Sequence, residues 1–244
     1  MNPAILAQLA PTGRLRAGIN MSNFLLVSSR GPNGEPQGVS PDMAEAVAEA
    51  LGVELERIPY PSPGALADAV ETNEWDIGLI GAEPQRAEKI AFTAAYAEIA
   101  ATYLVPSGSP ITDLAEIDRP GLRIAVSARS AYDLWLARNI HHATLLRAEG
   151  LQGAVDLFAR ENCDALAGLL PALLTDIARF PGARILPGRF TAVQQAIGTS
   201  RANTEAAAFL AGFVEDAKAS GLVARLIERH GVQGLSVAPV VERS

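Results

Sequence analysis

Short apolar runs alternate with amphipathic stretches along the whole chain, a pattern typical of α/β proteins. The apolar runs predict strands, and the stretches with a helical period predict helices between them. The predicted strands cover residues 15–20, 53–58, 75–81, 123–126, 163–167 and 193–197. The predicted helices cover residues 40–51, 63–72, 130–138, 151–159, 171–180, 204–219 and 222–229.

Two of these helices carry recognisable signals at their ends. Ser40 followed by Pro41 predicts a helix start with Ser40 as the N-cap, and Gly52 predicts the end of that helix. Ser130 and Asp133 have the spacing of a capping box, so a second helix is expected to begin at Ser130.

The amino-acid composition of the chain changes near its middle. A stretch rich in Pro, Gly and Ser at residues 106–110 separates two series of strands and helices, and a helical segment is left over at the end. Two α/β units joined in mid-chain predict two lobes with a cleft. Open α/β sheets bind ligands at the carboxyl ends of their strands, so the cleft is the default ligand site.

The composition narrows the range of functions. The chain has 244 residues with 20 basic and 27 acidic side chains, and this acidic balance argues against nucleic-acid binding. A single cysteine excludes an intrachain disulfide and a cysteine-based zinc site. His141 and His142 lack further ligands nearby in sequence, so we interpret them as part of a solvated loop and predict no metal. Nothing resembles a phosphate loop or a nucleophile–base pair, and we predict no cofactor.

The location of the protein is left open by its sequence. No apolar run approaches the roughly 18 residues of a membrane span, and the N-terminus lacks the basic and apolar regions of a secretory signal. We therefore expect either a cytoplasmic protein or a periplasmic one whose leader is missing here.

The first candidate for ligand chemistry is the segment Gly81 to Arg86, which directly follows a predicted buried strand. Pro84 predicts a helix start whose backbone N–H groups face the strand end, and Arg86 adds a planar guanidinium suited to a carboxylate. The alternative is that Arg86 is a solvated surface side chain.

The second candidate is the segment from Val126 to Asp133. Here too a strand leads into a helix N-terminus, with the hydroxyl of Ser130 at the cap. Two such termini, one in each lobe, would suit a single anion. The alternative is an ordinary capped helix.

These motifs together resemble the extracellular solute-binding proteins of family 3, the polar amino-acid receptors of ABC importers. The family pattern of an Asn-Gly turn followed by a helix ending in Leu-Gly-Val is matched by residues 33–44 and 51–53. The family pattern around Trp-Asp, Glu-x-Arg-Ala and Phe-Thr-x-x-Tyr is matched almost continuously by residues 75–96, and the block around Arg86 is its most specific part. The resemblance extends from Gly13 to Gly231.

The resemblance implies an α/β, two-lobed fold of the type II periplasmic-binding-protein kind, with a ligand cleft between lobes joined by a two-strand hinge. Lobe 1 would comprise residues 1–100 plus 198–244 and lobe 2 residues 101–197, with the hinge near 100–105 and 191–197. It also implies that Arg86 grips the ligand carboxylate and that the backbone and hydroxyl at Ser130 complete this grip.

Several positions depart from the family pattern. The aromatic entry segment is replaced by residues 23–26, where only Phe24 supplies a flat ring. Ala82 stands where the family has a small hydroxyl residue, and Glu83 stands where it has Thr. The Asp that holds the ligand's α-ammonium in the family falls on Leu169.

Two interpretations follow from the apolar residue at 169. The ligand is an organic acid without an α-amino group, or Glu83 replaces the missing Asp from the other lobe and holds a cationic group. As a third possibility, Glu83 forms a structural pair with Arg86 and caps the helix.

We predict a binding site without catalytic residues or metal ligands. Gln194 and Gln195 face opposite ways on a strand, so at most one of them is expected to meet the ligand. The predicted ligand-binding residues are Arg86, Ser130, Gly81, Glu83, Ala82, Phe24, Asn23, Arg129, Tyr132, Leu169 and Gln194.

The function predicted from these residues and the resemblance is capture of a small carboxylate-bearing metabolite by hinge closure, for ABC-type uptake. We expect the protein to be a monomer whose partner is an ABC permease. The runner-up is a cleft enzyme of the cyclohexadienyl dehydratase type, which resembles the same family and needs a buried acid. A cytoplasmic metabolite-binding protein and a sensor module are the other interpretations.

Overall fold

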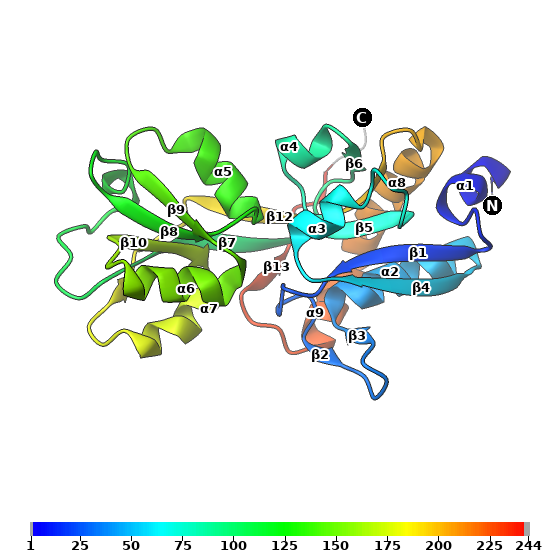
Figure 1. Ribbon diagram of the computed structural model, residues 1–244. Coiled ribbons are helices and arrows are strands. Elements are labelled where there is room, and N and C mark those ends of the chain that lie inside the picture. Colours follow the sequence, from blue (N-terminus) through cyan, green and yellow to red (C-terminus); the bar gives the residue numbers. More distant parts are fainter. Residues whose placement is uncertain (1, 242–244) are drawn as a thin grey trace. The chain divides into compact units, whose positions relative to one another are not determined.

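The computed structural model describes residues 2–241, and this part of the chain divides into two compact units (Figure 1). Unit 1 takes the chain up to Glu98 and again from Gln194 onward, and unit 2 takes Ile99–Val193. The chain leaves unit 1 inside β7 (Ala97–Val105) and returns to it inside β12 (Thr191–Ser200). The α/β architecture expected from the alternation of patterns is confirmed. The predicted lobe limits, 1–100 plus 198–244 and 101–197, stay a prediction.

Unit 1 contains a mixed β-sheet, in which some neighbouring strands are parallel and others antiparallel. Besides parts of β7 and β12, its strands are β1 (Arg14–Asn20), β2 (Ser29–Arg30), β3 (Pro36–Gln37), β4 (Glu54–Tyr60), β5 (Ile77–Gly81), β6 (Ile90–Phe92) and β13 (Leu235–Val237). Its main sheet has the order β4-β1-β5-β12, with β1 parallel to both β4 and β5 and with β12 antiparallel to β5. Because β5 lies inside this sheet, all five of its residues are buried.

Helices cover this sheet and the segments beside it. They are α1 (Pro3–Leu9), α2 (Val39–Leu51), α3 (Pro63–Asp68), α4 (Pro84–Ala87), α8 (Thr204–Ala219) and α9 (Leu222–Arg229). Trp75, Leu66 and Ile80 form part of the core beneath α3, where the indole Nε1 of Trp75 donates to the backbone oxygen of Leu66 at 2.9 Å. A buried indole with a satisfied N–H contributes a large apolar surface without leaving a polar atom unpaired.

The start of α2 differs from the prediction. The N-cap is Gly38, not Ser40, and Gly38 makes no side-chain cap bond. Gly38 has φ of 147°, and a Cβ there would lie 2.3 Å from the backbone oxygen of Leu26. The close approach of these two segments requires glycine and moves the helix start upstream. The hydroxyl of Ser40 instead contacts the buried hydroxyl of Tyr96 at 2.8 Å. The predicted helix end at Gly52 is confirmed by its left-handed conformation.

Unit 2 has a β-sheet with helices on both faces (Figure 1). Besides parts of β7 and β12, its elements are β8 (Arg123–Ser127), α5 (Ala131–Asn139), β9 (Thr144–Ala148), α6 (Gly150–Arg160), β10 (Ala165–Leu169), α7 (Leu170–Asp176), β11 (Arg184–Ile185) and 3₁₀ turns at Leu114–Glu116 and Ile177–Arg179. The strand order is β7-β10-β8-β9. Since β10 is parallel to β8, the carboxyl ends of these two strands lie at the same edge of the sheet.

The core of unit 2 forms where α6 and α7 pack on this sheet. Phe158 of α6 makes an edge-to-face contact with Phe180, with 5.0 Å between ring centroids. Cys163 lies in the same cluster as a free, buried thiol whose pKa is raised by burial. The raised pKa disfavours the thiolate and agrees with an inert structural cysteine.

Several short elements differ from the sequence expectation. The helix predicted at 63–72 ends at Asp68, and the last predicted strand extends over Thr191–Ser200. The apolar pattern did not predict β2, β3, β6, β7, β9, β11 and β13. β13 has three residues and β9 has no buried residue, so neither carries a strong apolar period.

A buried ion pair joins β1 to the start of β5. Both carboxylate oxygens of Asp76 are bonded: one accepts from the amide and Nε of Arg16, at 2.9 and 3.1 Å, and the other accepts from its Nη2 at 2.7 Å. Only 2% of the Asp76 side chain is exposed, so the attraction is weakly screened by water.

We expect Asp76→Ala to lower the free energy of unfolding by about 3–5 kcal/mol, because it leaves a half-buried guanidinium without its partner. Urea denaturation measures this change. The control is Glu54→Ala, which removes the exposed ion pair between Glu54 of β4 and Arg14 of β1, the strand that also carries Arg16. That pair should contribute at most about 1 kcal/mol. Equal losses in the two variants would contradict a special role for burial at Asp76.

Candidate functional site

The guanidinium of Arg86 lies at the carboxyl end of the buried strand β5. Its side chain belongs to α4, and its Nη1 donates to the backbone oxygen of Gly81 at 2.7 Å. Arg86 is only 7% exposed, which rules out a solvated surface arginine. α4 has only four residues, so its helix dipole is weak. The positive charge at the end of β5 therefore comes from the side chain of Arg86 and not from the N-terminus of α4.

Glu83 lies one turn before Arg86 and is 9% exposed. It is the N-cap residue of α4, but its carboxylate forms no cap bond with this helix. Glu83 thus occupies the N-cap position that the helix-cap interpretation gives it, but without a side-chain cap bond. Its pairing with Arg86 and its contact with a cationic group of the ligand stay predictions.

The returning strand β12 places Gln194 beside this corner. The amide of Ala82 donates to the backbone oxygen of Gln194 at 2.7 Å, and Gln195 pairs with Gly81 in the sheet. Gln195 is buried, whereas Gln194 is half-buried and bonds through its carboxamide. The two glutamines therefore face opposite ways, as expected for neighbours on a strand.

Glu98 belongs to the same corner and was missed by the sequence reasoning. Its Oε1 accepts from Nε2 of Gln194 at 3.0 Å. Glu98 lies near the start of β7, where most neighbouring residues are apolar and buried. The signal in the sequence that could have indicated Glu98 is a single charged residue within an apolar run, because a carboxylate is rarely buried in a strand without a partner.

Asn23 and Phe24 lie in the loop that follows β1, the strand beside β5. The Oδ1 of Asn23 accepts from the amide of Leu25 at 3.2 Å and so stabilises its own turn. Phe24 is 44% exposed, an unusual placement for a large apolar ring. Their contact with a ligand stays a prediction.

In unit 2, the residues around the start of α5 form a compact polar cluster. The Oγ of Ser130 accepts from the amide of Asp133 at 3.1 Å and so caps the helix, as predicted. The reciprocal bond of a capping box is displaced by one residue, since the Asp133 carboxylate accepts from the amide of Arg129 at 2.8 Å. The cause is the left-handed backbone of Arg129, whose φ is 59°.

Tyr132 and Leu169 complete this edge of unit 2. The hydroxyl of Tyr132 bonds with Ser130 and Ser127, and burial raises its pKa to about 12. Leu169 ends β10 and is buried, so its apolar side chain lies at the strand edge where β8 also ends. The structure thus groups Arg129, Ser130 and Tyr132 in unit 2, and Gly81, Ala82, Glu83, Arg86 and Gln194 in unit 1.

His141 and His142 lie on an exposed loop, and their backbone amides donate to the carboxylate of Asp118. Within residues 2–241, no three His, Cys, Asp or Glu side chains are grouped so that they could hold a metal ion.

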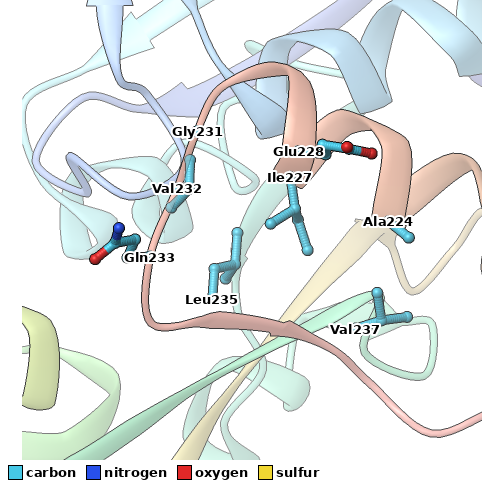
Figure 2. Close-up of a pocket in the computed structure, with 8 residues that line it drawn as sticks. All are labelled: Ala224, Ile227, Glu228, Gly231, Val232, Gln233, Leu235 and Val237. Atoms are coloured by element: carbon cyan, nitrogen blue, oxygen red, sulfur yellow. The ribbon is translucent and has the colours of Figure 1, made fainter.

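Two hollows of unit 1 lie apart from these residues. One of about 440 Å³ lies between α9 and the segment that follows it, where Ile227 and Leu235 face it (Figure 2). The other, of about 500 Å³, is lined by residues of β6, α8 and their neighbours, including Phe92 and Arg201. Neither is lined by a predicted ligand-binding residue.

Comparison with protein families gives a match over most of the chain. The model of the bacterial extracellular solute-binding proteins, family 3, matches residues 15–233. This match confirms the resemblance inferred from the motifs around Arg86. No curated protein sequence matches the chain.

Three solved structures with the same fold are described as amino-acid-binding or contain a bound amino acid. An amino-acid ABC transporter substrate-binding protein from Streptococcus pneumoniae, bound to L-arginine, is 20% identical with a TM-score of 0.73, covering 96% of this chain and 99% of that chain. A binding component of an ABC transporter from Wolinella succinogenes, complexed with lysine, is 20% identical with a TM-score of 0.73, covering 89% and 95%.

The third structure is the ancestral amino-acid-binding protein AncCDT-1, a precursor of cyclohexadienyl dehydratase. It is 21% identical with a TM-score of 0.72, covering 92% of this chain and 97% of that chain. Similarity at this level of identity establishes the fold, and the predicted type II periplasmic-binding-protein fold is confirmed.

All four tyrosines of the chain have a pKa raised mainly by burial, and that of Tyr132, at about 12, is the lowest of the four. We expect the folded protein to form no tyrosinate near pH 10, where an unfolded chain titrates. Since the folded pKa values exceed the unfolded ones, this contribution to stability is complete below about pH 10 and is lost as the pH rises towards 12.

Near-ultraviolet absorbance titration with and without urea measures the difference. Tyr132→Phe should remove the first step of the folded titration. A folded-state step near pH 10 would show that at least one tyrosine is solvated.

Proposed function

The chain belongs to the bacterial extracellular solute-binding proteins of family 3, and on that premise we propose that it captures a small carboxylate-bearing metabolite, an amino acid or a related organic acid. The observation that carries this proposal is the buried guanidinium of Arg86 at the end of β5. The bond from its Nη1 to Gly81 orients the guanidinium group. A planar carboxylate is the anion that best matches the parallel N–H donors of a guanidinium.

The two units have complementary parts in this proposal. Arg86 of unit 1 holds the carboxylate, and membership of the family implies that the hydroxyl of Ser130 and the backbone N–H groups at the start of α5 complete this grip. The nine residues of α5 give its N-terminus a dipole that favours an anion. Closure occurs by bending within β7 and β12, where the chain passes between the units. Exclusion of water on closure strengthens the guanidinium–carboxylate pair.

We propose capture for uptake over catalysis. A dehydratase-type enzyme needs an acid placed at the substrate with a tuned pKa. At the unit 2 edge, Leu169 is apolar and Asp133 is already bonded to Arg129 and Arg147. The fold shared with a dehydratase precursor keeps this enzyme as the second candidate, and detection of a converted ligand would favour it.

The cellular role follows from the family. We propose delivery of the ligand by a monomer to an ABC permease, with the periplasm as the compartment; a cytoplasmic metabolite-binding protein is the alternative. Among residues 2–241 there is no helix with the length and apolar character that crossing a bilayer requires.

The experiment that tests the proposal is a thermal-shift and calorimetric screen of amino acids, keto and hydroxy acids, aromatic acids and polyamines, with mass spectrometry for turnover. We expect carboxylate-bearing ligands to raise the melting temperature and to survive unchanged. Arg86→Lys should weaken the best ligand roughly ten- to a hundredfold, because a single ammonium cannot replace the fork.

The matched control for Arg86→Lys is Arg14→Lys, which changes an exposed arginine of the same unit. It should leave binding unchanged, and both variants should keep the far-ultraviolet circular dichroism of the original protein. Unaltered affinity in a folded Arg86→Lys protein would remove Arg86 from the site.

Substitution of Glu83 tests whether the ligand carries a positive charge near Arg86. If its carboxylate contacts a cationic group, Glu83→Gln should lose selectivity for amino acids over the matching acids without an amino group. The comparison of affinities for such pairs measures this. An unchanged ligand profile would assign Glu83 to a structural pair.

A further inference from the structure

Lys218 is a buried lysine that the proposed site does not use. It belongs to α8 of unit 1, and none of its side chain is exposed. Its ammonium lies 2.9 Å from a carboxylate oxygen of Glu215, one turn earlier on the same helix, whose side chain is 11% exposed. Removing two charges from water is costly, so such a pair needs further hydrogen bonds to be stable.

Both members of this pair bond to the backbone of the segment that begins with β13. Nζ of Lys218 donates to the backbone oxygen of Pro239 at 2.7 Å, and Oε2 of Glu215 accepts from the amide of Val241 at 2.9 Å. Hydrogen bonds in which one partner is ionised are stronger than neutral ones. We call residues 235–241 the strap, and the ion pair ties one end of the strap to α8.

The strap buries little apolar surface of its own. Leu235 and Ala238 are buried, whereas Val237, Val240 and Val241 are 37%, 55% and 55% exposed. The hollow of about 440 Å³ beside α9 is lined by Leu235 and Val237 (Figure 2). Because a segment with little buried apolar surface opens locally at low cost, the attachment of the strap depends on its polar bonds.

The other end of the strap lies along β7. β13 pairs with β7, the amide of Ala238 donates to the backbone oxygen of Tyr96 at 3.1 Å, and the hydroxyl of Ser236 donates to that of Glu98 at 3.4 Å. Glu98 is the last residue of unit 1 before β7 leaves it. β12, the strand by which the chain returns, is also a neighbour of β7 in the sheet.

A bonded neighbour of this kind restrains the bending of a strand. Hydrogen bonds between strands weaken steeply when donor and acceptor are misaligned. A change in the direction of β7 at Glu98 therefore disturbs its bonds to the strap, unless the strap moves with it. Because the strap is tied to α8 at Pro239 and Val241, it is held with unit 1 and cannot follow.

We propose that the buried ion pair of Lys218 and Glu215 clamps the strap to unit 1 and thereby restrains the bending of β7. The clamp then sets how freely the two units move relative to one another, and with it the ease of closure. Neither residue touches the ligand in this proposal, since both act through the strap. The inference rests on the hinge closure of the proposed function, and its test uses no ligand.

The test variant is Lys218→Met/Glu215→Leu, which removes both bonds to the strap and leaves neither charge buried alone. Replacement of a buried ion pair by apolar residues of similar volume commonly keeps stability, so the variant should fold. Hydrogen exchange followed by NMR should show the amides of Ala238 and Val241 exchanging roughly ten- to a hundredfold faster, as expected for the loss of charged hydrogen bonds. Amides of β1 and β5 should keep their original rates.

The matched control is Lys89→Met/Glu71→Leu. It removes an ion pair of the same residue types in unit 1, at 2.6 Å, whose side chains are 55% and 56% exposed. This control should change neither the exchange of the strap nor the motion of the units.

Motion of the units is measured by pulsed electron paramagnetic resonance between two spin labels. The labels are attached at Glu88→Cys in unit 1 and Ala159→Cys in unit 2, which are exposed positions. Cys163 is buried and so is shielded from the label. We expect a broader distribution of distances between the labels in Lys218→Met/Glu215→Leu than in the original protein or the control, because the released strap no longer restrains β7.

The outcomes separate the clamp from the hinge and from the ligand. Unchanged exchange of the strap in the test variant would show that Lys218 and Glu215 do not hold it. A released strap with an unchanged distance distribution would confine the pair to the fold of unit 1 and overturn its role at the hinge. Faster exchange throughout β1 and β5 would assign the effect to a general loss of stability, which also overturns the inference. A ligand screen without a hit would remove the proposed capture and leave both measurements decisive for the clamp.

Discussion

The antiparallel pairing of β12 with β5 is the constraint on which the candidate site of unit 1 depends. It sets Gln195 opposite Gly81, and Thr199 adds a bond from its hydroxyl to the backbone oxygen of Asp76 at 2.9 Å. The amide of Tyr96 also donates to the backbone oxygen of Gln195. Three segments that are distant in sequence are therefore joined here: Arg86 bonds to Gly81, the backbone of Gln194 bonds to Ala82, and the side chain of Gln194 bonds to Glu98.

Buried charges in this protein come with partners, and the partner decides the role. Asp76 is saturated by Arg16 and fixes β5 against β1. Asp133 is balanced by Arg147 and shapes the turn before α5. In both pairs the attraction offsets the cost of removing charge from water, and the groups are committed to the fold. Arg86 is buried as well, and its Nη1 donates to the backbone oxygen of Gly81, which orients the guanidinium at the end of β5.

The two units divide the chemistry between them. The start of α5 concentrates hydroxyls and backbone donors, and the end of β5 concentrates ionised side chains of both signs. Leu169 adds a buried apolar side chain at the end of β10.

The sequence by itself determined the α/β class, the positions of most helices and of six strands, the two-unit organisation and the family. These follow from short-range periodicity and from motifs such as that around Arg86, which need no knowledge of distant residues. Ser130 as a helix cap was likewise readable, since a cap and its helix are local. Tertiary structure alone decided that Gly38 and not Ser40 starts α2, because the close approach to Leu26 sets that boundary. It alone joined Glu98 to Gln194, since strand pairing over long sequence separations leaves no periodic trace in either segment.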